Sequence, residues 1–407
     1  MEFAEGRVYT VKFEKKTKSI LYGMEFTHGI RRALMSALAL VYFISLGFNV
    51  VSVTTLFAIS GIIMMFFEFP TGAIADYDSR KKSIVISFFL LSLAFFGIFI
   101  FNNFWLLAIS WILGDIAWTF STGAGSAWSI DALKYAKEKS KIVSLISKGY
   151  FFEKSGHIVG GLIGLIIVAI NFRFVWLVVS FTNLVMMFII IFYMEERNFK
   201  PEKVPHNYLK KSLIKARESF SYVFHKSNKE LRTLLMGSFV SVIAISSFFV
   251  GVPIFLTQIM GMKPEFLAGM FSIFAVVSLC ATFFAEKMNH KNGIRASLII
   301  VSLIMGILII TFSLSPYLLM AIIILGIFEG VETINDIIED SARQHEFSSK
   351  IRASLGSLNS INWTISNSIG VFFAGIGISL LGVVDTMIIS GVLGIFVPII
   401  YLWGLKK

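Results

Sequence analysis

The sequence is poor in charged residues and in cysteine. Asp, Glu, Lys and Arg make up only 15% of its 407 residues, whereas soluble globular proteins carry roughly a quarter. With 56% hydrophobic residues, the chain has too few charges to build a water-exposed surface, which excludes an ordinary soluble protein. Its one cysteine, Cys280, excludes an internal disulfide and a cysteine-based metal site.

Other absences exclude further classes of protein. Only 7 prolines and 31 glycines are present, which excludes collagen-like and disordered chains. Residues 1–18 are polar and of mixed charge, without the apolar core of a signal peptide. There is no phosphate-binding P-loop, zinc pattern or catalytic serine grouping. We therefore expect no enzymatic activity, no cofactor and no bound metal.

Long hydrophobic segments dominate the rest of the chain. A membrane-spanning helix needs about 20 mostly apolar residues. Twelve segments meet this requirement: 24–47, 50–70, 83–101, 104–127, 147–170, 174–194, 233–258, 266–286, 296–314, 317–338, 354–380 and 386–404. They predict an all-α integral membrane protein with six-helix halves at 1–194 and 233–407, joined by a linker at 195–232.

The connections between these segments alternate between short neutral loops and basic loops. Lys and Arg accumulate on the cytoplasmic side of membrane proteins, so we expect the linker and both termini to be cytoplasmic. The formal net charge of +11 then reflects orientation in the membrane and not nucleic-acid binding. We expect a monomeric, multi-pass protein of a prokaryotic plasma membrane, in contact with lipid. Part of the linker, 209–224, is alternatively an amphipathic helix on the membrane surface.

The two halves carry similar short stretches. Residues 105–114 and 317–326 align without a gap, each from an aromatic-Leu-Leu start to an Ile-Leu-Gly end. Both open the fourth predicted helix of their half. Transporters are commonly built from such internal repeats, with the binding site near mid-membrane where the repeats meet.

A recognisable motif follows the second hydrophobic segment. It runs from Glu68 through Pro70, Thr71 and Gly72 to Ile84, and resembles the signature loop of the major facilitator superfamily. The matching positions are Gly72, Ala75, Asp76, Arg80, Lys81 and Ile84; Tyr77 and Ser79 depart from the usual Arg and Gly. The Glu-x-Pro-Thr-Gly start and the stretch Gly114–Asp131 are similar to the drug-efflux-like branch of that superfamily.

The resemblance implies a gate on the cytoplasmic side. Charge-assisted hydrogen bonds are strong at such a boundary, and in the family an acid at the end of the fourth helix joins the charges of the signature loop. Asp131 is the candidate here. The predicted gating residues are Gly72, Asp76, Arg80, Lys81 and Asp131.

Several ionisable residues fall inside predicted spans, where an unpaired charge is expensive. Asp115, His157, Glu329 and Glu332 are the candidates for carrying a coupling proton. Arg31 and Arg32 are interpreted as ion-pair partners or as side chains that reach the interface. Glu339 and Asp340, near the end of their helix, are expected to be solvated.

Polar and aromatic residues on two helices suggest a substrate cavity. The candidates are Trp118, Asn362, Trp363 and Asn367, although the asparagines also suit contacts between helices. The glycines from Gly156 to Gly164 are interpreted as a helix-packing surface. A secondary transporter follows as the expected function, exporting a small molecule in exchange for protons. The alternatives are a transporter of cationic or metal substrates and a non-transporting sensor or lipid flippase of the same fold.

Overall fold

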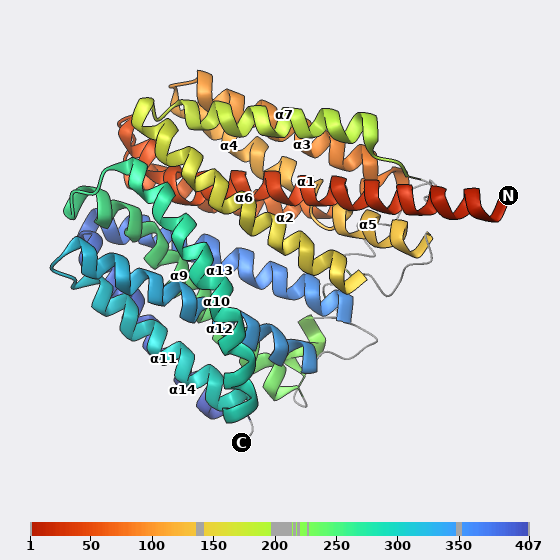
Figure 1. Ribbon diagram of the computed structural model, residues 1–407. Helices are drawn as coiled ribbons and strands as arrows, with labels where there is room; N and C mark the ends of the chain where they lie inside the picture. Colours follow the sequence, from red (N-terminus) through yellow and green to blue (C-terminus); the bar gives the residue numbers. More distant parts are fainter. Residues whose placement is uncertain are drawn as a thin grey trace. The chain divides into compact units, whose positions relative to one another are not determined.

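The computed structural model describes residues 2–135, 142–196, 228–346 and 352–405, together with 214, 217 and 220–225 (Figure 1). Helices are the only regular elements among these described residues. Their bounds are α1 Glu2–Ser45, α2 Val50–Ala73, α3 Arg80–Ile100, α4 Phe104–Thr119, α5 Ala124–Tyr135, α6 Ile142–Ile170, α7 Phe174–Tyr193, α9 Lys229–Ile254, α10 Pro264–Asn292, α11 Ile294–Ser313, α12 Leu318–Glu346, α13 Arg352–Leu381 and α14 Val383–Gly404. Two π-helical turns, Ile74–Asp78 and Phe255–Ile259, follow α2 and α9.

Eleven helical stretches of the described chain are long and apolar enough to cross a membrane. They correspond to the predicted segments from 50–70 onward, and the predicted all-α membrane fold is confirmed. The first predicted segment, 24–47, lies in α1, which begins at Glu2 and is 44 residues long. At 1.5 Å per residue such a helix extends about 66 Å, roughly twice the hydrocarbon thickness of a bilayer.

The fourth predicted helix is interrupted. The segment 104–127 was expected to be continuous, but α4 ends at Thr119 and α5 begins at Ala124. Gly123 adopts φ +75°, a backbone conformation that suits glycine because it has no Cβ. Ser83 Oγ of α3 donates to the Phe120 carbonyl at 2.7 Å, so a carbonyl freed by the break is satisfied by the neighbouring helix.

The chain divides into two compact units. The first contains residues 1–39, 63–209 and 268–272, and the second contains 40–62, 210–267 and 273–407. Within the first, α3 packs against α4, α5 and α7; within the second, α14 packs against α9 and α11. The predicted halves at 1–194 and 233–407 stay a prediction, because most of the linker at 195–232 lies outside the described residues.

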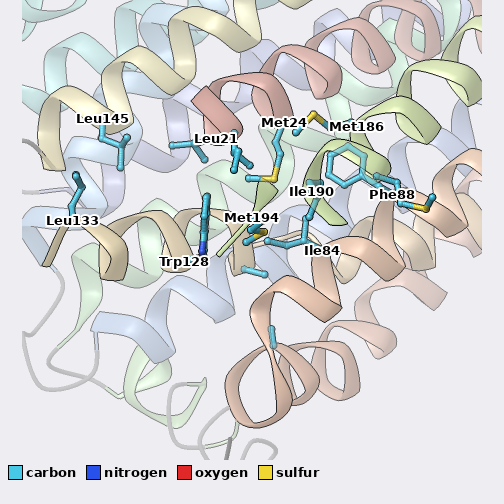
Figure 2. Packing of buried hydrophobic residues seen from close by; sticks show 14 residues of the cluster. Leu21, Met24, Ile84, Phe88, Trp128, Leu133, Leu145, Met186, Ile190 and Met194 are labelled. Carbon is cyan, nitrogen blue, oxygen red and sulfur yellow. The ribbon is translucent and has the colours of Figure 1, made fainter. Parts of the chain in front are cut away.

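A cluster of buried hydrophobic side chains holds the first unit together. Figure 2 shows Leu21 and Met24 of α1 near Trp128 of α5 and Met186 of α7. The cluster also includes Phe88 of α3, so its burial fixes the positions of α1, α5 and α7 around α3.

Candidate functional site

The signature turn after α2 is fixed by an acidic residue from the end of α7. Ser79 caps the start of α3 by accepting a hydrogen bond from the Lys82 amide. Glu196 accepts from Ser79 Oγ at 2.6 Å and from the Arg80 amide at 2.8 Å. A carboxylate that accepts from a helix N-terminus is stabilised by the amide dipoles. Sequence reasoning missed Glu196, because it was assigned to the linker.

The structure brings two of the predicted gating residues together. Arg80 of α3 forms an ion pair with Asp131 of α5. Lys81 Nζ donates to the Ile191 carbonyl of α7 at 2.8 Å. Asp76 is exposed in the π-helical turn and forms no ion pair with another described residue, and Gly72 is half-buried in α2. The gating role of these residues stays a prediction.

Neighbouring contacts reinforce this end of the first unit. Trp128 Nε1 donates to the Glu195 carbonyl at 2.9 Å, and the Glu195 carboxylate pairs with Lys16 of α1 at 2.6 Å. The segment after α7 therefore joins α1 and α5 through one residue. No signal in the sequence connects Lys16 with Glu195, since 179 positions separate them.

A second polar cluster lies between α1, α4 and α6. Arg32 of α1 pairs with Glu153 of α6 at 2.5 Å, and the Glu153 side chain is almost completely buried. Arg31 lies over the Trp118 ring at 4.3 Å and is attracted electrostatically by Asp115. Arg32 thus has the ion-pair role expected from the sequence, whereas Arg31 is held by an aromatic ring.

His28 occupies the centre of this cluster. Its ring stacks on Phe88 at 5.0 Å and meets Trp118 edge-on at 4.6 Å. Its Nε2 lies 3.3 Å from Ser121 Oγ. His157, a proton-coupling candidate, is half-buried on α6 one turn beyond Glu153. His28 is not among the candidates predicted from the sequence.

Glycines allow α1 and α6 to approach at the level of these charges. A Cβ on Gly156 would lie 2.0 Å from the Phe26 carbonyl oxygen, and one on Gly160 would lie 2.8 Å from Ile30 Cα. A Cβ on Gly29 of α1 would lie 2.0 Å from the Glu153 carbonyl oxygen. No side chain fits at these positions, so the interpretation of the glycine motif as a packing surface is confirmed.

The second unit has its own row of acids along α12. Glu329 and Glu332 are half-buried, and Asp336 one turn further on is exposed. These residues lie on one face of the helix, because they are spaced by three and four positions. The role of Glu329 and Glu332 in proton coupling stays a prediction.

The end of α12 differs from expectation. Glu339 was expected to be solvated, yet it is 4% exposed, pairs with Arg343 at 3.3 Å and accepts from Tyr401 Oη at 3.2 Å. Arg343 also pairs with Asp340 at 2.6 Å, and this partner is exposed as expected. The correction follows from α14, which brings Tyr401 over the end of α12 and covers Glu339.

The predicted cavity residues of α13 make contacts with α9. Asn362 Nδ2 donates to the Leu235 carbonyl at 3.3 Å, and Asn367 Oδ1 accepts from Ser246 Oγ at 2.7 Å. Trp363 is half exposed. Of the four cavity candidates, Trp118 alone lines a cavity of about 250 Å³ in the first unit, between α1, α5 and α6. Among the described residues, no three or more potential metal ligands lie together.

Comparison with known proteins places this arrangement in a family. The family model described as Major Facilitator Superfamily matches residues 21–349, well over half of the chain. No curated protein sequence matches. Among solved structures, a point mutant of the nucleoside transporter NupG has a TM-score of 0.80 at 13% identity, covering 97% of this chain and 100% of that one.

Two further structures have the same fold. A bacterial homologue of the human lysosomal transporter Spinster has a TM-score of 0.77 at 14% identity, with 96% of this chain and 97% of that one covered. A POT family transporter in complex with a thioalcohol-conjugated peptide has a TM-score of 0.76 at 14% identity, with 95% of each chain covered. At such low identity these similarities show the fold alone. The family match and the fold agree: the chain belongs to the major facilitator superfamily and is a transporter of that fold.

Proposed function

We propose that this protein is a secondary active transporter that exports a small molecule by alternating access, driven by protons. The observation that carries the proposal is the pair of half-buried carboxylates, Glu329 and Glu332, inside a membrane-spanning helix. Two ionised carboxylates three residues apart repel each other, and each is costly to keep charged in a low-dielectric surrounding. Binding a proton relieves both costs, so this pair suits a proton-driven cycle.

The direction of transport is inferred from a sequence resemblance. The Glu-x-Pro-Thr-Gly sequence from Glu68 to Gly72 resembles the drug-efflux-like branch of the superfamily, which favours export. The row of acids from Glu329 to Asp336 also supports the alternative of a cationic cargo, which is compatible with export.

The experiment uses purified protein in proteoliposomes with a trapped pH-sensitive dye and an imposed pH gradient. Fluorescent organic cations, ethidium and rhodamine 6G, serve as cargo probes. The wild type should move a probe against its gradient while protons flow inward. Glu329→Gln, which preserves shape but does not titrate, should retain probe exchange between two sides at equal pH while losing the response to the gradient.

The matched control is Glu265→Gln, the same chemical change in the first turn of α10; it should behave as the wild type. Full gradient-driven transport by Glu329→Gln would place the coupling proton elsewhere, with Asp115 and His157 as the next candidates. Absence of flux for both probes in the wild type, with or without a gradient, would favour a non-transporting sensor or flippase.

A further inference from the structure

A short helix in the described part of the linker packs against the start of α9. Residues 214, 217 and 220–224 are helical, and we call them the linker helix. Val223 is completely buried and packs with Leu231 of α9, and Leu358 of α13 lies against this pair. All of these residues belong to the second unit. The Val223 side of the linker helix is therefore fixed on two of the membrane-spanning helices.

The same contact places the linker helix at the membrane boundary. Leu231 lies in the first turn of α9, whose candidate membrane span begins at Lys229. Lys229 Nζ donates to the Trp403 carbonyl at 2.9 Å, and Trp403, which is 81% exposed, stands next to the last residue of the α14 span. Tryptophan side chains are enriched where a bilayer meets water. The start of one span and the end of another thus mark one boundary, and the linker helix lies beside it.

The linker helix presents an aromatic patch at this boundary. Phe220 is 54% exposed and Phe224 is 50% exposed, and their ring centroids lie 4.5 Å apart. Around the helix they lie about 60° and about 100° from Val223, so the patch begins beside the face that packs against α9. Helices with an apolar face of this kind lie in the plane of a membrane surface, with that face at the boundary between headgroups and acyl chains. We therefore expect lipid, and not water, around the two rings.

Basic residues accompany the aromatic patch. Arg217 is exposed and lies about 20° from Phe224 around the helix, so it borders the patch. The sequence from 209 to 229 contains one acidic residue, Glu218, and six basic ones: Lys210, Lys211, Lys215, Arg217, Lys226 and Lys229. Clusters of about four to eight Lys or Arg next to a spanning helix attract anionic phospholipid headgroups. A zwitterionic headgroup has no net charge and is attracted less.

We infer that the linker helix binds anionic phospholipid at the membrane surface, with Phe220 and Phe224 between the acyl chains and Arg217 at the headgroup phosphates. The leaflet is the one on the side of the basic loops, which we expect to be cytoplasmic. The apolar groove of a partner protein is the other conceivable occupant. The position at the end of two spans and the basic residues beside the rings favour lipid. Contact with lipid needs neither cargo nor a proton gradient, so it is independent of the proposed function.

The test is fluorescence quenching on the full-length protein in lipid nanodiscs. The single cysteine is removed as Cys280→Ser, and a bimane fluorophore is attached to Phe224→Cys. All nanodiscs contain the same mixture of phosphatidylcholine and phosphatidylglycerol. A nitroxide quencher near the top of the acyl chain is carried by one lipid or by the other, at equal mole fraction. We expect both lipids to quench the label, and the anionic one to do so about twofold more strongly or better. Phe220→Cys repeats the measurement at the other ring.

Phe396→Cys is the matched control, because Phe396 is 54% exposed on the spanning helix α14 of the same unit. Its label should be quenched equally by the two lipids.

The charge is tested in the Phe224→Cys protein. Arg217→Gln should reduce the preference for the anionic lipid, whereas Lys263→Gln, at the opposite end of α9, should not. Raising the salt concentration from about 0.1 M to about 1 M should also reduce it, because the charges are screened. The comparison of the two quencher lipids uses one labelled protein and does not depend on the folding of Arg217→Gln. No quenching at either phenylalanine position, equal quenching by the two lipids, or an unchanged preference in a folded Arg217→Gln protein would each overturn the inference.

Discussion

Replacing Gly156 with alanine should push α1 and α6 apart at the level of the Arg32–Glu153 ion pair. The new Cβ would lie 2.0 Å from the Phe26 carbonyl oxygen, whereas ordinary contact begins at 3.4 Å, so the two backbones must separate by roughly 1.4 Å there. Overpacking of this kind costs about 1–3 kcal/mol. The better helix propensity of alanine returns at most about 1 kcal/mol. Subtracting the full gain leaves a net loss of about 0–2 kcal/mol, and the clash with a backbone carbonyl, which cannot rotate away as a side chain can, places this variant at the upper end of that range.

The assay is thermal unfolding of the purified protein in detergent, followed by tryptophan fluorescence. Gly114→Ala is the control: it is also a helical glycine of the first unit, but its Cβ would lie 3.6 Å from the Ala94 Cβ, an ordinary contact. It should be neutral or slightly stabilising. Because Glu153 lies three residues before Gly156, the alanine should also lengthen its 2.5 Å pair with Arg32. Equal stability of Gly156→Ala and wild type would refute the close packing of α1 and α6.

Two further variants test the ion pairs at the helix ends. Arg343→Gln should destabilise the second unit by about 3–5 kcal/mol in thermal unfolding, because Glu339 would remain buried without its counter-ion; a stability equal to wild type would contradict the buried pair. Asp131→Asn, which removes the partner of Arg80, should impair probe flux in proteoliposomes while changing stability by less than about 1 kcal/mol. Lys82→Gln, which removes an exposed ion pair of the same turn, should leave flux unchanged, and normal flux in Asp131→Asn would argue against a gate.

The course of the chain through the membrane was predictable from hydropathy, because a bilayer imposes a length and a polarity on each span. The same argument explains one omission and one error. Residues 2–23 also belong to α1, but they are too polar to be counted in a predicted membrane span. The break after Thr119 was missed because the surrounding residues are uniformly apolar or small, and Gly123 alone does not distinguish a turn from a packed helix.

Partners were harder to predict than positions. The sequence singled out Arg32 and Arg80 as charges in need of partners, but it did not identify Glu153, on a distant helix, as the partner of Arg32. Glu339 was misjudged because its burial depends on Tyr401 of α14. Such pairings arise only when distant helices pack together. A single sequence shows where a charged side chain needs a partner, and the structure is needed to show which residue that partner is.

The turn between α4 and α5 has a consequence for how this region tolerates insertions and deletions. In an unbroken helix, one added residue rotates everything beyond it by about 100° and shifts it by about 1.5 Å. Here Trp118 precedes the turn and Asp131 follows it, so the two belong to separate helical registers. A change of length at Gly123 can be absorbed by the turn. Trp118, whose ring lies against Arg31, and Asp131, which pairs with Arg80, are therefore free to change in evolution independently of each other.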